Sequence, residues 1–186
     1  KKIDNLYLKV IAGSLPLGLL IFFFPALYGE GYETLKLILS GHGTDILDTS
    51  LFHSFKDNEL IFIVILIAII FLKVIAMVMT NGAGGVGGIF APSLFVGGLT
   101  GFVVALVLNK ASFINVPVSN FSLVGMAGIM AGVMHAPMTA VFLIAEITGG
   151  YTLFVPLIIT SLVSYLTIMY FEPHSIYHKR LAEKGQ

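Results

Sequence analysis

Cysteine is absent from the 186-residue sequence, and charged residues are scarce. Without cysteine the chain forms no disulfide, no thiolate-ligated metal site and no thiol nucleophile, although this leaves its compartment open. Ten basic and ten acidic residues make up 11% of the chain and cancel to a net charge of zero. Because soluble domains carry about 25% charged residues, this chain has too few to cover a surface that faces water. Without an excess of positive charge, we expect no nucleic acid among its partners.

Hydrophobic residues take the place of the missing charge. They make up 57% of the sequence, and its mean hydropathy is +0.98. Intrinsic disorder requires low hydrophobicity and is therefore excluded. Between residues 60 and 172 only Lys73, Lys110 and Glu146 are charged. The sequence predicts an all-α, polytopic integral membrane protein embedded in the lipid bilayer.

Apolar segments separated by glycine and proline predict where the helices lie. At 1.5 Å per residue, residues 60–79 span a hydrocarbon core of roughly 30 Å, and residues 6–28 are predicted to span the membrane as well. By contrast, residues 137–148 extend over only roughly 18 Å and are too short to cross. Broken and tilted helices are therefore expected. The complete set of predicted helices is 6–28, 32–39, 60–79, 90–108, 120–134, 137–148 and 153–171, with a last short helix from about residue 175.

Basic residues near the two ends predict an orientation. They are Lys1, Lys2, Lys9, Lys179, Arg180 and Lys184. The positive-inside rule places both ends, including the C-terminus, in the cytoplasm. Residues 29–59, which carry an acidic cluster, would then be an exposed connection outside. The expected location is the cell (inner) membrane.

A glycine-rich run at residues 81–92 interrupts the apolar helices. Gly82, Gly84 and Gly87 match the spacing of a dinucleotide-binding fingerprint, but that fingerprint follows a β-strand and this run follows a predicted membrane helix. A second interpretation is that these glycines let helices pack closely, as small residues do in membranes.

The third interpretation of the run is an anion site, because it lies immediately before a predicted helix start at Phe90. A helix start leaves unpaired N–H groups and the positive end of the helix dipole. Glycines let an ion approach the backbone, and Pro92 suits a first turn, where its missing N–H would be unpaired anyway. Such a helix end binds an anion without a charged side chain, and weakly enough for the ion to leave again.

These residues also carry a family resemblance. Gly-Ile-Phe-Ala-Pro at 88–92 resembles the GxFxP signature of the CLC chloride channels and proton-coupled chloride transporters. The resemblance covers essentially the whole chain, because further segments agree in the same order. They are Pro25-Ala-Leu-Tyr-Gly-Glu-Gly31, Gly125-Met-Ala-Gly128, His135-Ala-Pro137 with Ala145-Glu146-Ile-Thr148, and Ser175-Ile176-Tyr177.

The resemblance implies a fold that is one inverted-repeat half of a CLC-type membrane domain, in a protein that works as a homodimer. It implies transport of chloride, by a voltage-gated-type channel or a proton–chloride antiporter, with no enzymatic activity, no catalytic residue and no cofactor. Backbone N–H groups of Ile89 and Phe90 would bind the central chloride, and the Tyr177 hydroxyl would close the site from the cytoplasmic side. The full set of implied chloride-binding residues is Gly88, Ile89, Phe90, Ala91, Pro92 and Tyr177.

Two family motifs are missing from the sequence. The first is the GSGIP turn with an ion-binding serine, and the second is the GREGP turn with the gating glutamate. The resemblance therefore identifies residues 1–186 as the C-terminal half of the membrane domain, without a cytoplasmic regulatory domain. Channel and antiporter both stay open. So do two other classes, namely a different secondary transporter with broken helices and a non-transporting membrane subunit.

Three further polar residues have mainly structural interpretations. Glu146 is a candidate proton relay, as any intramembrane acid is, but its place near the end of a short helix favours a structural role. Lys73 is expected to extend its ammonium group toward the membrane interface. His135 is expected at a helix junction, and the other histidines show no ligand spacing, so we expect no metal site.

Overall fold

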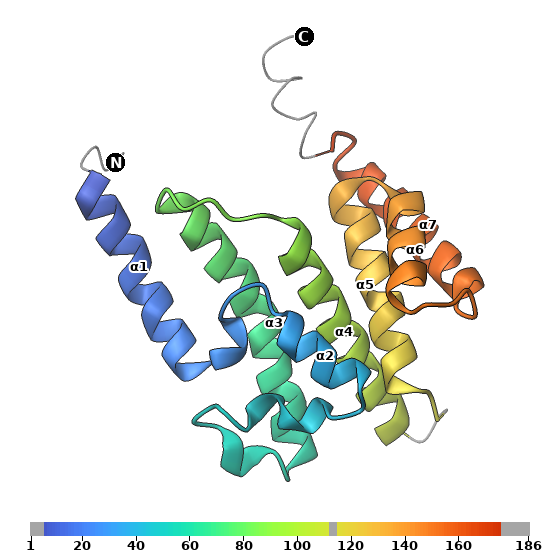
Figure 1. The fold of residues 1–186 in the computed structure, drawn as a ribbon, viewed down its shortest axis with the longest axis horizontal. Coiled ribbons are helices and arrows are strands. Elements are labelled where there is room, and N and C mark those ends of the chain that lie inside the picture. The colour runs from blue at the N-terminus through green and yellow to red at the C-terminus, as the bar shows by residue number, and fades with distance from the viewer. Residues whose placement is uncertain (1–5, 112–114, 176–186) are drawn as a thin grey trace. The chain divides into compact units, whose positions relative to one another are not determined.

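The computed structural model of the chain describes residues 6–111 and 115–175. Throughout these residues the backbone is helical or irregular, with seven α-helices, three short 3-10 helices and no β-strand (Figure 1). The predicted all-α class is therefore confirmed. The chain divides into two compact units, Lys1–Phe95 and Val96–Gln186.

The first unit is built on the contact between its two longest helices, α1 and α3 (Figure 1). A Cβ atom at Gly13 would lie 2.5 Å from the Cβ atom of Ala83, so glycine permits this close approach. Helix α1 ends at Phe23, five residues before its predicted end, because Phe24 precedes a proline and leaves the helical conformation, with φ −126° and ψ 81°. The elements in chain order are α1 (Leu6–Phe23), η1 (Pro25–Leu27), α2 (Tyr32–Leu39), η2 (Gly43–Leu47), η3 (His53–Phe55) and α3 (Glu59–Gly82).

The connection at residues 29–59 is more ordered than an exposed loop, and that expectation is wrong in part. The amphipathic helix predicted at 32–39 is confirmed as α2, and it buries Leu35 and Ile38. Ile46 and Leu47 of η2 are also buried and contribute to the same small core. At an exposed position of this connection, a hydrogen bond from Lys56 to Asp48, 2.9 Å long, raises the pKa of the lysine above its usual value.

Among the residues that the structure describes, three helices are long and apolar enough to cross a membrane: α3, α4 (Phe90–Lys110) and α7 (Phe154–Phe171). Asn58 caps the start of α3, because its side chain accepts a hydrogen bond from the Ile61 N–H at 3.4 Å. Within α1, the segment Val10–Phe23 belongs to the shorter apolar helices, so its crossing stays a prediction.

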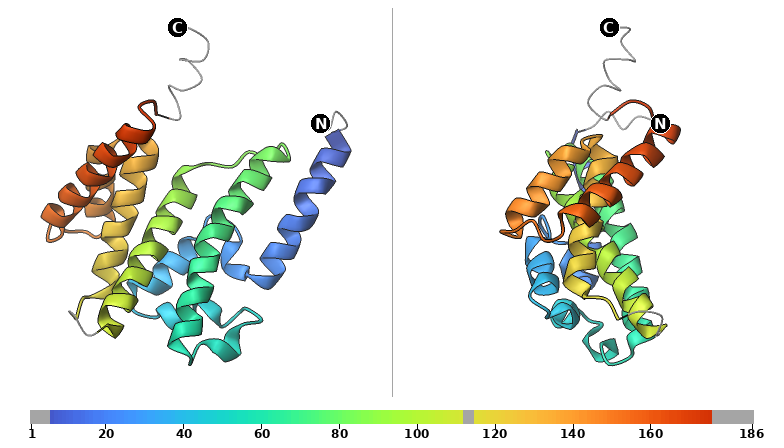
Figure 2. Two further views of the ribbon diagram at one scale, coloured as in Figure 1. Left: turned by 180° about the vertical axis from the view of Figure 1, so that it is seen from behind. Right: turned by 90° about the vertical axis from the view of Figure 1, so that its right-hand side faces the viewer.

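The second unit gathers α5 (Val118–Met134), α6 (Pro137–Ile147) and α7 into a three-helix cluster, visible from two further directions (Figure 2). Helix α6 has 11 residues, which confirms a helix too short to cross. Helices α5 and α7 approach closely through small residues. The Ser164 hydroxyl donates to the Gly128 carbonyl oxygen at 2.6 Å, and a Cβ atom at Gly132 would lie 2.8 Å from the same hydroxyl oxygen.

The backbones of α4 and α5 are in direct contact where the later part of α4 crosses α5. A Cβ atom at Gly97 would lie 2.5 Å from the Gly125 carbonyl oxygen, and one at Gly125 would collide with the Gly97 carbonyl oxygen. One turn further along, a Cβ atom at Gly101 would collide with the Phe121 carbonyl oxygen. No residue larger than glycine fits at these three positions.

Candidate anion site

The glycine-rich run begins by terminating α3. The Ala83 N–H donates to the Met79 carbonyl oxygen at 2.8 Å, and the Gly85 N–H donates to the Thr80 carbonyl oxygen at 2.9 Å. Between them, Gly84 has a φ of +98°, in the region that side chains other than glycine rarely adopt. These hydrogen bonds satisfy the last carbonyl groups of α3 and turn the chain out of the helix.

Asn81 fixes the second half of the run. Its side-chain oxygen accepts the Gly87 N–H at 3.1 Å, and a Cβ atom at Gly87 would lie only 3.0 Å from that oxygen. Asn81 is not among the residues predicted from the sequence to shape the site. The available signal was an asparagine directly before a glycine run, because its short amide side chain readily bonds nearby backbone groups.

Within the described residues, the glycines of this run make no close contact with another helix, so nothing there supports the helix-packing interpretation drawn from the sequence. A Cβ atom at Gly82, Gly84 or Gly88 would have no neighbouring atom within 4 Å. Gly85 and Gly87 meet only atoms of the run itself and the end of α3. The side of the backbone at Gly88 is therefore open.

Helix α4 starts at Phe90, as the sequence predicts. Its first internal hydrogen bond runs from the Ser93 N–H to the Ile89 carbonyl oxygen at 3.1 Å. Pro92 falls in the first turn, where its missing N–H costs nothing. In the part of the chain that the structure describes, the N–H groups of Ile89, Phe90 and Ala91 donate to no acceptor. Gly88 is exposed, whereas Ile89 and Phe90 are half-buried.

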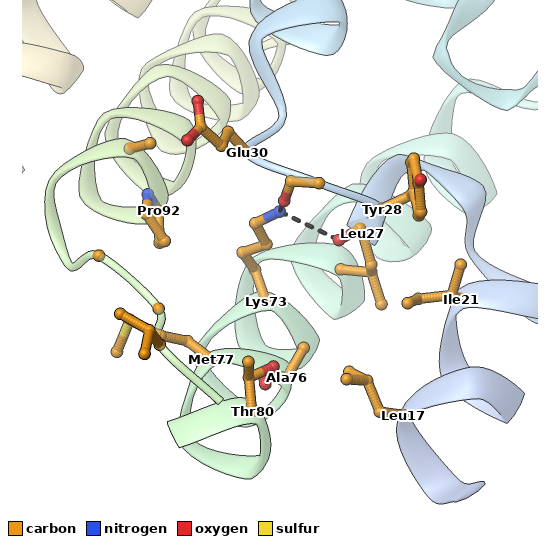
Figure 3. Close-up of a pocket in the computed structure, with 15 residues that line it drawn as sticks. Leu17, Ile21, Leu27, Tyr28, Glu30, Lys73, Ala76, Met77, Thr80 and Pro92 are labelled. Carbon is orange, nitrogen blue, oxygen red and sulfur yellow. Dashed lines mark hydrogen bonds between the residues drawn. The ribbon is translucent and has the colours of Figure 1, made fainter. Parts of the chain in front are cut away.

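A cavity of about 370 Å³ lies beside this helix start (Figure 3). Gly87, Gly88 and Pro92 line it on the side of α4, and among the described residues Lys73 and Glu30 alone bring charged groups to its wall. The cavity lies wholly within the first unit. The structure therefore places the open backbone of the run, the α4 N-terminus and a lysine around one space.

Lys73 is buried, with 4% of its surface exposed, so the expectation that it reaches toward the membrane interface is wrong. Its ammonium group donates to the Leu27 carbonyl oxygen at 3.1 Å, drawn in Figure 3, and to the Gly29 carbonyl oxygen at 2.8 Å. It also lies 4.7 Å from the centre of the Phe95 ring. The turn after η1 brings these acceptors to the ammonium group inside the protein, which offsets the cost of burying it.

His135 lies at the junction of α5 and α6, as predicted. It caps α5 with a left-handed backbone, φ 54° and ψ 34°, and is the only described residue other than glycine with a positive φ. Its Nε2 atom donates to the Glu172 carbonyl oxygen at 3.0 Å, which ties this junction to the end of α7.

Two of the predicted residues remain, Tyr177 and Glu146. Tyr177 lies outside the described residues. The Glu146 side chain is exposed near the end of α6 and is not among the residues that line the cavity. Across residues 6–111 and 115–175 there is no cluster of three or more His, Cys, Asp or Glu that could hold a metal ion.

The chain is similar to known proteins of one family. Residues 1–168 match the family model described as "Voltage gated chloride channel". The chain is 30% identical over 181 residues to the voltage-gated ClC-type chloride channel ClcB of Escherichia coli O81 (strain ED1a), which covers 94% of this chain and 38% of that protein. It is 33% identical over 148 residues to the H(+)/Cl(-) exchange transporter ClcA of Vibrio cholerae serotype O1, which covers 78% of this chain and 27% of that protein.

Among solved structures, the X-ray structure of a slow cyanobacterial Cl⁻/H⁺ antiporter matches with a TM-score of 0.58 and 23% sequence identity. The match covers 98% of this chain and 48% of that one. The chain thus spans less than half the length of each of these relatives.

Proposed function

This chain belongs to the voltage-gated chloride channel family, and we propose that it forms the C-terminal half of a membrane domain that transports chloride. Its likeness to the antiporter structure shows that the helices form part of a CLC-type fold. Relatives named as a chloride channel and as a proton–chloride exchange transporter support chloride as the transported ion and protons as a coupled one. We propose neither an enzymatic activity nor a cofactor.

Chloride, in this proposal, binds at the start of α4. The supporting observation is that the N–H groups of Ile89 and Phe90 donate to no acceptor within the described residues, beside a glycine whose open side lines a cavity. Unpaired N–H groups and the helix dipole place roughly half a positive charge at this end. An anion is therefore held without direct contact to a full charge, and such weak binding suits an ion that must leave again.

The other parts of the proposal come from the family resemblance. Tyr177 donates its hydroxyl hydrogen to the same ion from the cytoplasmic side. The complete protein works as a homodimer in the cell (inner) membrane, with its C-terminus in the cytoplasm. Residues upstream of this segment supply the serine ligand and the gating glutamate.

Chloride flux from liposomes tests this proposal. The protein to use is the complete gene product that contains these 186 residues, and comparing flux with and without a pH gradient tells a channel from an antiporter. Gly88→Leu fills the open side of the run and Tyr177→Phe removes the hydroxyl group. Each is expected to lower chloride flux about tenfold or more, since a lost interaction of about 1.4 kcal/mol changes binding tenfold.

Gly18→Leu is the matched control, because Gly18 is exposed on α1 and a side chain there also meets open space. It should leave the flux unchanged. If Gly88→Leu and Tyr177→Phe also leave it unchanged, the residue assignment is wrong. If the unmodified complete protein carries no chloride, transport itself is wrong and a non-transporting membrane subunit is the better interpretation.

A further inference from the structure

The Lys73 ammonium group makes specific contacts with two other segments of the first unit. Apart from Glu59 at its first position, it is the only charged residue of α3. Two backbone carbonyl oxygens, those of Leu27 and Gly29, accept hydrogen bonds from its ammonium group at 3.1 and 2.8 Å. On another side, the ring of Phe95 lies 4.7 Å away. The lysine thus joins the turn after η1 to a side chain of α4.

Phe95 is immobilised between two parts of the first unit. It is fully buried. A Cβ atom at Gly31 would collide with its ring, so the backbone of Gly31 lies directly against the ring. Gly31 has a φ of +89° and caps the start of α2, which makes glycine necessary at this position for two reasons. The ring is therefore clamped between the Lys73 ammonium group and the Gly31 backbone.

This clamp lies close to the start of α4. Phe95 follows Phe90 by five residues, about one and a half helical turns. An α-helix is rigid over this length, so fixing the Phe95 ring fixes the direction of the N–H groups in the first turn. The cavity that Gly88 and Pro92 line is also lined by Lys73.

We propose that Lys73 is a positioning residue of the anion site, which acts through Phe95 to hold the first turn of α4 in place. This inference rests on the proposed function. Two of the three ammonium hydrogens are already donated to carbonyl oxygens, so the lysine acts on the helix and not as a chloride ligand. Loss of its charge should therefore change how well chloride binds, and the preference among anions, more than it changes the amount of protein.

The test compares variants of the complete protein in liposomes. Lys73→Met keeps the length of the side chain but removes the charge, Phe95→Leu removes the ring, and Lys73→Arg keeps a cation. The measurements are the half-saturating chloride concentration, the maximal flux and the ratio of bromide to chloride flux. Misfolded protein lowers the maximal flux but leaves the half-saturating concentration and the anion ratio unchanged, so these two readouts separate positioning from stability.

Lys73→Met and Phe95→Leu are each expected to raise the half-saturating concentration about fivefold or more, which corresponds to about 1 kcal/mol. The double variant should exceed the stronger single variant only slightly, because both changes break the same contact. Lys73→Arg should lie closer to the unmodified protein. Lys36→Met is the matched control, since it removes the same charge from an exposed position of α2, and it should change neither readout.

The inference is overturned if the unmodified protein transports chloride while Lys73→Met and Phe95→Leu both keep its half-saturating concentration and anion preference. If Lys73→Met cannot be purified in folded form, Phe95→Leu decides the question alone, because it leaves the buried cation with both carbonyl partners. A complete protein that carries no chloride would refute the proposed function instead, so the two failures are distinguishable.

Discussion

Glycine residues have two distinct roles in this chain. The two roles differ in how much space a Cβ atom would have at each glycine. Gly82, Gly84 and Gly88 have open space where a side chain would lie, and they shape a turn before a helix start. Gly97 and Gly125 have no room for a side chain, because each lies against the backbone of the other helix. Only the second group is needed for helix packing, whereas the first leaves the backbone accessible to an ion.

Gly125→Ala should strongly destabilise the protein, because its Cβ atom would collide with the Gly97 carbonyl oxygen. Overpacking of this kind costs about 1–3 kcal/mol. Gly18→Ala is the control in an open helical position, where alanine is favoured over glycine by about 1 kcal/mol. Thermal unfolding of the purified protein should show a lower Tm for the first variant only. Equal Tm values for the two would mean that α4 and α5 do not cross at these glycines.

Helices and their breaks were largely predictable from the sequence. Proline and glycine mark where apolar segments end, and the predicted helix starting at Phe90 and the short helix from Pro137 agree with α4 and α6. What sequence alone could not reveal depends on contacts between distant residues. Lys73 finds its acceptors on a turn more than forty residues earlier, and no local pattern shows that such a turn folds back to it.

Only the part of the candidate site that lies within one continuous segment was predictable, because contacts between distant residues leave no local sequence pattern. The start of α4 and its unpaired N–H groups follow from a glycine run before a helix with proline in its first turn. The cavity beside it and the Phe95 clamp required the fold.

Asn109 should control the order of the connection between α4 and α5. Its side chain donates to the Val116 carbonyl oxygen at 3.1 Å and accepts the Val116 N–H at 2.7 Å. Asn109→Leu removes both hydrogen bonds, each worth about 0.5–1.5 kcal/mol. Hydrogen exchange at the Val116 amide is therefore expected to become about tenfold faster, with Asn120→Leu as the control. An unchanged exchange rate would show that other contacts hold this connection.

At the scale of the whole molecule, the proposed function makes the chain one part of an ion pathway. It spans 38% of the ClcB relative and 48% of the antiporter structure. The start of α4 offers backbone N–H donors to one side of an ion. The GSGIP and GREGP motifs of the family's first half are missing from the sequence. Helices of a single half leave the pathway without its remaining ligands and its gate.

The 186-residue chain on its own should therefore carry no chloride. Liposomes that contain it are expected to release chloride no faster than protein-free liposomes, whereas the complete gene product releases it. A chloride-selective electrode measures both, and co-reconstitution with the upstream part should restore the flux. Chloride release by the isolated chain would contradict the assignment as one half of a transport domain.

The position of Lys73 in the sequence also matters for how the protein is made. Its acceptors at Leu27 and Gly29 lie 46 and 44 residues nearer the N-terminus, so the ribosome synthesises them first. A lysine at the middle of a membrane helix costs about 2.5–3.5 kcal/mol on insertion. When α3 leaves the ribosome, the segment that supplies the two carbonyl acceptors has already been synthesised. The order of synthesis thus lets the first unit insert with its buried cation matched from the beginning.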